Sequence, residues 1–118
     1  MRNKVRLIHT SDLHLGDDMG HPLADGALRA VVDSVSRLGG DMLLLVGDVF
    51  DHGRVPDSVL EAFLEEIARI SQPAVLLPGN HDLYDDNSLY QREVFQHKPD
   101  NLHIITQTDG EALSFPEL

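Results

Sequence analysis

The chain has 118 residues, 42% of them hydrophobic, which is enough for one folded domain with a modest core and too few for two. Its 20 acidic and 9 basic residues give a net charge of −11, and the basic residues form no cluster, so the chain offers nucleic acid no broad basic surface. It has no cysteine, which leaves oxygen and imidazole as the available metal ligands. No apolar segment has the length of a signal peptide or a membrane span, and we expect a cytoplasmic protein with no membrane association.

The first predicted strand covers residues 5–9 and leads into a short polar motif. In this motif Asp12 and His14 are two residues apart, so in an extended backbone both side chains fall on the same face and can bind one ion. An Asp-x-His triplet on its own is more often a polar loop. The other motifs of the chain are needed to distinguish an ion-binding pair from a polar loop.

A helix and a second strand follow in the predicted order. Apolar residues recur at helical spacing over residues 23–38, which predicts an amphipathic helix that Gly39 and Gly40 end. The five apolar residues Met42–Val46 predict a parallel strand covered on both faces. Gly47 then allows a turn and places Asp48 over the carboxyl edge of the sheet, where open α/β sheets bind ligands. A carboxylate in that position needs a cation as its partner.

The second half of the chain repeats the alternation of helix and strand. A second helix is expected over residues 57–70 with Asp57 as its N-cap, and Ala74–Leu77 is expected to form a third strand. A short helix is expected over residues 88–96, and strands over 102–105 and 111–115, the last after an Asp-Gly hairpin signal. The apolar face of the second helix comprises Leu60, Phe63, Leu64 and Ile67.

Three of these strands end in polar residues that can serve one site. In a parallel sheet the carboxyl ends of successive strands lie on one edge, so the polar residues should converge although they are far apart in the sequence. Their oxygen and imidazole groups suit Mn, Fe, Zn or Mg, and a carboxylate can bridge two ions. The six residues are Asp12 and His14, Asp48 and Asp51, and Asn80 and His81.

The three polar blocks also match a known family. The chain resembles the calcineurin-like metallophosphoesterases, whose first half carries Asp-x-His, Gly-Asp-x-x-Asp and Gly-Asn-His-Asp/Glu blocks in this order. The resemblance covers nearly the whole chain up to about Tyr84, and it implies the N-terminal half of an α/β sandwich with a mostly parallel sheet flanked by helices. The blocks stand here as Asp12-Leu13-His14, Gly47-Asp48-Val49-Phe50-Asp51 and Gly79-Asn80-His81-Asp82.

The resemblance also implies a role for each motif residue in a site with two divalent ions. Mn is the first choice of metal, and Fe, Zn or Mg are the alternatives. Asp12 and His14 would bind the first ion, Asp48 would bridge both, and Asn80 would bind the second. His81 would face the substrate phosphate, with Asp51 orienting its ring, as the catalytic pair. Two ions about 4 Å apart can activate a water molecule and hold the phosphoryl oxygens.

Within the family, the first two blocks are most similar to the bacterial DNA-repair exonuclease branch of SbcD type. If the chain acts as a repair nuclease, the resemblance implies a phosphodiester substrate in DNA and an ATPase subunit as partner. Some nucleases of this branch have His where Asp51 stands. The serine/threonine phosphatase branch ranks low, because its second block ends in Asp-Arg-Gly and this one ends in Asp51-His52-Gly53.

The chain departs from the family after the third block. The family completes its metal shells with three further histidines, usually including a Gly-His-x-His block, and this sequence has only His81, His97 and His103 after Asn80. We therefore expect residues 1–118 to be the N-terminal portion of a metallophosphoesterase domain that binds metal weakly and turns over little on its own. The alternatives are a phosphomonoesterase or nucleotide phosphohydrolase of the same superfamily, and a non-catalytic fragment.

Overall fold

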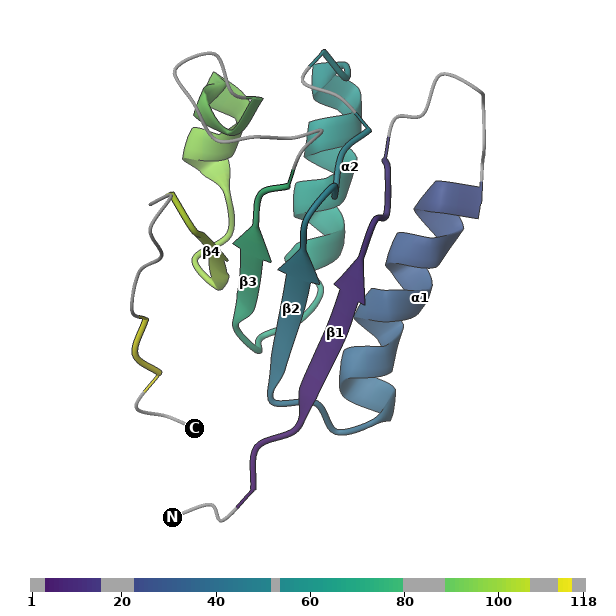
Figure 1. Cartoon of the computed structure of the whole chain (residues 1–118), viewed down its shortest axis with the longest axis vertical. Helices are drawn as coiled ribbons and strands as arrows, with labels where there is room; N and C mark the ends of the chain where they lie inside the picture. The colour runs from purple at the N-terminus through teal and green to yellow at the C-terminus, as the bar shows by residue number, and fades with distance from the viewer. Residues whose placement is uncertain (1–3, 16–22, 52–53, 80–88, 107–112, 116–118) are drawn as a thin grey trace.

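The computed structural model describes residues 4–15, 23–51, 54–79, 89–106 and 113–115, and they form a parallel sheet with helices packed on it (Figure 1). Its four strands lie side by side in chain order, and every neighbouring pair is parallel. The predicted α/β class with a parallel sheet and flanking helices is therefore confirmed. The elements are β1 (Leu7–Ser11), α1 (Leu23–Arg37), β2 (Met42–Val46), α2 (Asp57–Ile67), β3 (Ala74–Leu77), the 3-10 helices η1 (Leu89–Gln91) and η2 (Glu93–His97), and β4 (Leu102–Ile104).

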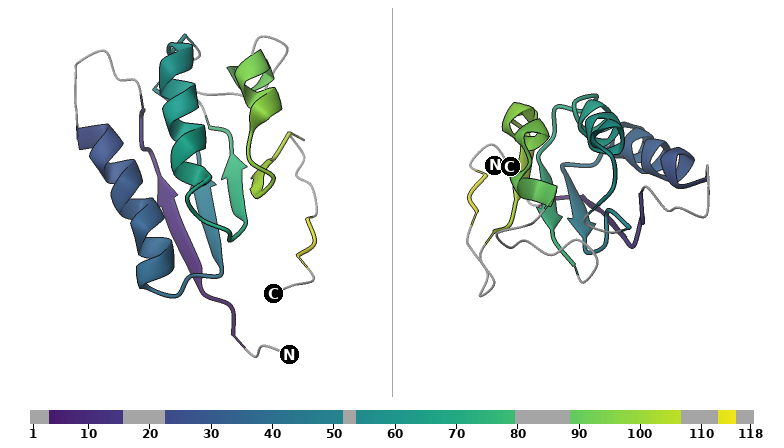
Figure 2. Two further views of the ribbon diagram at one scale, coloured as in Figure 1. Left: turned by 180° about the vertical axis from the view of Figure 1, so that it is seen from behind. Right: turned by 90° about the horizontal axis from the view of Figure 1, so that it is seen from above.

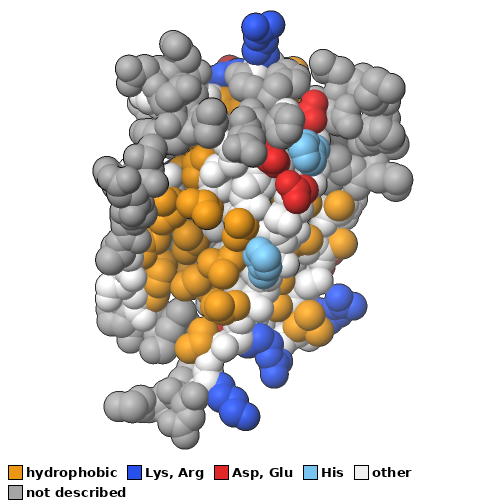
Figure 3. Space-filling model, viewed as in Figure 1, with side chains coloured by type: hydrophobic (Ala, Val, Ile, Leu, Met, Phe, Trp, Pro, Cys, Tyr) orange, Lys and Arg blue, Asp and Glu red, His pale blue; other side chains and the backbone are white. Residues whose placement is uncertain are grey.

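Helices α1 and α2 lie on the same face of the sheet (Figure 2). Crossovers between parallel strands are right-handed, so a sheet that grows in one direction places successive helices on one side. On the helix side of β2, Leu43 and Leu45 are fully buried, whereas Leu44 on the opposite side is only half-buried. The expectation that β2 is covered on both faces is thus not met in the described part. Figure 3 shows hydrophobic side chains over the open face, where Leu7 and Leu77 are exposed.

The core lies between the sheet and the helices, and the second motif is anchored in it. Phe50 is fully buried, and its ring centroid lies 5.1 Å from that of Phe63 in α2 in an edge-on arrangement. The rings of Tyr90 and Phe95, from the two 3-10 helices, lie 5.9 and 6.3 Å from Phe50. This aromatic cluster holds the segment between Asp48 and Asp51 against the body of the domain.

Several element ends differ from the sequence expectations. The strand β1 begins and ends two residues later than expected. The N–H of Arg6 donates to the Asp41 carboxylate (2.8 Å) just before the ladder with β2 begins, and the ladder then continues to the pair of Ser11 and Val46. Leu38 lies beyond the end of α1 and is 47% exposed, although its spacing placed it on the buried stripe. Asp57 is the first residue of α2, and Pro56 occupies the N-cap position.

The C-terminal segments also differ from expectation in part. The helix α2 ends at Ile67 and not at residue 70, and the Asn101 side-chain amide donates to the carbonyls of Ile70 (3.1 Å) and Gln72 (2.9 Å) just beyond it. The short helix expected over residues 88–96 is a pair of 3-10 helices. Residues 113–115 are not a strand, and the expected hairpin lies outside the described residues. No described helix has the length and apolar character needed to cross a membrane.

Candidate metal centre

The segments that follow β1 and β2 continue side by side beyond the sheet. The N–H of Asp12 donates to the Gly47 carbonyl (3.1 Å), and the N–H of His14 donates to the Asp48 carbonyl (3.0 Å). One residue further on, Leu15 and Phe50 form an isolated parallel bridge. These bonds extend the parallel ladder into the two motifs, so the backbone fixes the spacing between their side chains.

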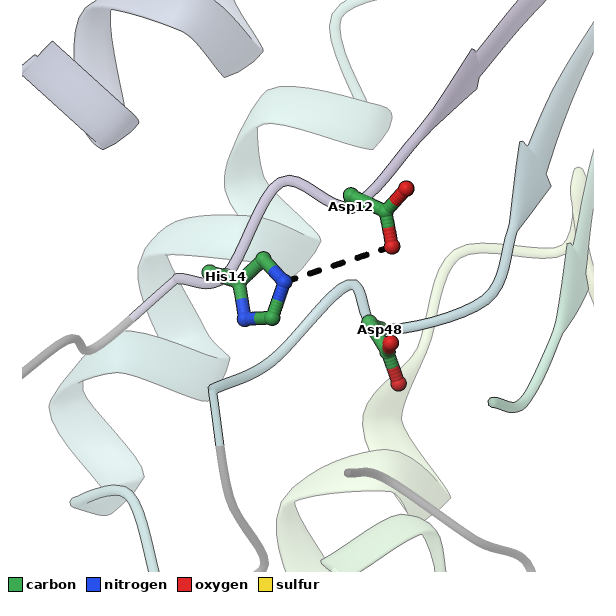
Figure 4. Close-up of side chains that lie close together, drawn as sticks. All are labelled: Asp12, His14 and Asp48. Carbon is green, nitrogen blue, oxygen red and sulfur yellow. Dashed lines mark ion pairs between the residues drawn. The ribbon is translucent and has the colours of Figure 1, made fainter. Parts of the chain in front are cut away.

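Three of the four predicted metal ligands lie together at this edge. One ligand atom from each of Asp12, His14 and Asp48 lies within 4.8 Å of the other two. Nε2 of His14 lies 4.0 Å from an oxygen of Asp12, and the Asp48 carboxylate comes from the neighbouring segment (Figure 4). Asp12 is exposed, and His14 and Asp48 are half-buried. This donor set fits a divalent cation of the Mn, Fe or Zn type. The assignment of these residues as ligands stays a prediction.

The remaining predicted site residues come from the second and third blocks. Asp51 lies beside His14, with its Oδ1 3.1 Å from Nδ1 of the imidazole, a contact that the sequence did not indicate. Asn80 and His81 lie outside the described residues. Their roles, and the orientation of the His81 ring by Asp51, therefore stay predictions.

Gly79, the first residue of the third block, lies against the second block. The N–H of Gly47 donates to the Leu77 carbonyl (2.7 Å), which joins the two segments just after β2 and β3. A Cβ at position 79 would lie 2.5 Å from the Asp48 nitrogen and 2.6 Å from its Oδ1. The Asp48 segment is thus packed between the first and third blocks. The sequence analysis named Gly79 as the first residue of the third block but gave it no role in the site.

The backbone of the three clustered residues is strained. Asp12, His14 and Asp48 have φ values of 54°, 50° and 51°, and they are the only non-glycine residues with positive φ in the described part. A left-handed conformation costs an ordinary residue about 1–2 kcal/mol, although Asp tolerates it better. Such strain gathers at functional sites, where the surrounding structure enforces it. Here the hydrogen bonds between the two motif segments provide that constraint.

Because of this strain, we expect glycine to be more stabilising than alanine at position 14, the reverse of the usual order. We expect His14→Gly to be more stable than His14→Ala by about 1 kcal/mol, because both variants lose the same imidazole and only glycine relieves the left-handed backbone. Urea unfolding of the metal-free variants measures the difference. In the paired control, Thr10→Ala in β1 should be more stable than Thr10→Gly. Equal or greater stability of His14→Ala would show that the φ of His14 is not strained.

Comparison with known proteins places the chain in a family. A sequence profile described as calcineurin-like phosphoesterase matches residues 5–115. The SbcD subunit of the SbcCD nuclease of Escherichia coli (strain K12) is 29% identical over an alignment of 85 residues, and the match covers 66% of this chain and 21% of that protein. Its counterpart in Bacillus subtilis (strain 168) is 28% identical over an alignment of 86 residues, and the match covers 66% of this chain and 22% of that protein. The chain thus spans about a fifth of the length of these curated relatives.

A solved structure agrees with this assignment at the level of the fold. The crystal structure of the Pseudomonas putida nuclease MPE superposes with a TM-score of 0.53 at 19% sequence identity. The match covers 85% of this chain and 47% of that one. The family profile spans all three motif blocks and the whole described sheet. On this match, the chain belongs to the calcineurin-like phosphoesterase family.

Proposed function

We propose that this chain carries the N-terminal part of a metal-dependent phosphoester hydrolase that acts on phosphodiester bonds, with DNA as the leading substrate. The observation that carries the proposal is the cluster of Asp12, His14 and Asp48 at the carboxyl edge of the sheet. Two carboxylates and an imidazole from two adjacent strand ends form a cation site whose geometry the backbone ladder maintains. Family membership supports the reaction class.

Each side chain then has a role at a centre of two divalent ions, with Mn²⁺ as the first choice. Asp12 and His14 would hold one ion and Asn80 would hold the other. Asp48 would serve both, a role supported by the hydrogen bonding of its segment to that of Asp12 and by the packing of Gly79 against it. When bound, the ions supply Lewis-acid charge and an activated water. His81 donates to the phosphate oxygens, or protonates the leaving oxygen, with Asp51 orienting its ring.

The choice of DNA follows the named relatives, two of which are nuclease subunits. With a net charge of −11, the chain attracts a polyanion only where bound cations reverse the local field. We infer that contact with DNA depends on the metal centre and on parts of the protein beyond these residues, including the three further histidines of the family pattern. We also infer an ATPase partner subunit and a cytoplasmic location.

The proposal predicts a large effect of the single substitution Asp48→Asn. With Mn²⁺ and bis-nitrophenyl phosphate, we expect the variant to hydrolyse the diester at least about 100-fold more slowly, because loss of a shared carboxylate removes several kcal/mol of transition-state stabilisation. Asp100→Asn, which removes the same charge at an exposed turn, should leave the rate unchanged. Equal rates in the wild type and in Asp48→Asn, both above the rate with Mn²⁺ alone, would dismiss the role of Asp48.

A comparison of substrates separates the proposal from its alternatives. DNA ends, nucleotides and phosphomonoesters should be offered to the same Mn²⁺-loaded protein. Cleavage of DNA ends in preference to the others supports the nuclease assignment. Preference for a monoester or a free nucleotide supports assignment as a phosphomonoesterase or nucleotide phosphohydrolase, and metal binding without turnover of any substrate supports a non-catalytic fragment.

A further inference from the structure

The contact between Asp51 and His14 gives Asp51 a role beyond the one derived from the motif pattern. Oδ1 of Asp51 lies 3.1 Å from Nδ1 of His14, and the two side chains are 30% and 34% exposed. His14 lies in the segment after β1 and Asp51 in the segment after β2, and backbone hydrogen bonds join these two segments. The N–H of Asp51 donates to the Leu15 carbonyl (2.9 Å), and Phe50 beside it is fully buried. The two side chains are partly shielded from solvent, and backbone contacts restrain the residues that carry them. Their relative position is therefore more restricted than that of an ion pair between exposed side chains.

The direction of this hydrogen bond determines which imidazole nitrogen can bind a cation. An ionised carboxylate only accepts, so the hydrogen of a neutral imidazole that bonds to Asp51 must reside on Nδ1. The lone pair then resides on Nε2, the nitrogen 4.0 Å from the Asp12 carboxylate. Asp51 therefore favours the tautomer that directs a ligand lone pair toward Asp12 and Asp48.

We propose that Asp51 is a positioning residue for the metal centre, one that sets the tautomer and ring orientation of His14. The proposal rests on the proposed function, because it assumes that His14 is a ligand. Carboxylates that accept from the second nitrogen of a ligating histidine commonly contribute 10–100-fold to metal affinity. Asp51 has a second carboxylate oxygen, so the role toward His81 predicted from the motif remains compatible with this one.

The first test reads the His14 tautomer in the metal-free chain by long-range ¹H–¹⁵N NMR at a pH where the ring is neutral. We expect the Nδ1–H tautomer in the wild type and a shift toward Nε2–H in Asp51→Ala. Asp51→Asn should keep the Nδ1–H tautomer, because its amide oxygen still accepts, and it also serves if the alanine variant does not fold. An Nε2–H tautomer in the wild type would overturn the proposal.

The second test measures Mn²⁺ affinity from the EPR signal of the free ion. Asp51→Ala should raise the Kd about 10–100-fold, and Asp51→Asn should raise it less. Asp100→Ala, at an exposed turn, is the control and should bind like the wild type. An unchanged Kd in Asp51→Ala would overturn the positioning role. Because the tautomer is measured without metal, the two tests can fail separately. If the wild type has the Nδ1–H form but binds no Mn²⁺, the result counts against the proposed function and supports the contact of Asp51 with His14.

Discussion

Gly79→Ala is expected to lower the free energy of unfolding by about 3 kcal/mol, at the upper end for the insertion of one methyl group into a packed site. The new Cβ would lie 2.5 Å from the Asp48 nitrogen and 2.8 Å from the Gly47 Cα, and both are backbone atoms that cannot rotate away. The hydrogen bond from Gly47 to the Leu77 carbonyl restrains the same segment. Relief of the clash requires the turn that carries Asp48 to move.

The matched control for this substitution is Gly26→Ala in α1. A Cβ there meets nothing within 4 Å, so the same methyl group should stabilise the helix by up to about 1 kcal/mol. Urea unfolding of the two variants should therefore give changes of opposite sign. Because the Cβ at position 79 would also lie 2.6 Å from Asp48 Oδ1, Mn²⁺ affinity should fall in Gly79→Ala and not in Gly26→Ala. A Gly79→Ala protein with wild-type stability would show that the two blocks are not in close contact.

Phe50→Ala is expected to destabilise the chain by about 4 kcal/mol, since it removes a fully buried aromatic ring and leaves a cavity. Its ring contacts Phe63, Tyr90 and Phe95, which come from three different elements. Domains are stable by only about 5–15 kcal/mol, so this single change could leave a large fraction of molecules unfolded. Thermal and urea unfolding followed by circular dichroism measures the loss.

Two comparisons make the Phe50 prediction specific. Phe50→Leu keeps most of the buried volume and should cost clearly less than Phe50→Ala. Leu38→Ala removes a residue that is 47% exposed, and it should change the stability by no more than about 0.5 kcal/mol. If Phe50→Ala were as mild as Leu38→Ala, the aromatic cluster would not be the anchor of the second motif.

The sequence predicted the core strands well because their signal is local. Met42–Val46 and Ala74–Leu77 have the expected bounds, since continuous apolar runs between breaking residues leave little choice. Ends set by contacts with distant residues were missed. The Arg6 N–H meets the Asp41 carboxylate, and the Asn101 side chain binds carbonyls beyond α2, neither of which any local pattern reveals.

The convergence of three candidate ligands was predictable from the sequence, but the geometry of the site was not. Parallel strands with polar ends were enough to expect Asp12, His14 and Asp48 at one edge, where the structure places them. Their left-handed backbone, the contact of Asp51 with His14 and the packing of Gly79 on Asp48 arise only when the segments meet. Spacing along one segment carries no information about such contacts.

The most direct test of the account is where Mn²⁺ binds in the ¹⁵N-labelled chain. Substoichiometric Mn²⁺ broadens amide signals steeply with proximity, so weak binding can still be located. We predict that the amides of residues 12–15 and 47–51 broaden first, and that Asp48→Asn abolishes this order. Earliest broadening around Glu61 and Glu65, two exposed acids of α2, or equal broadening over the whole chain, would contradict a metal centre at the sheet edge.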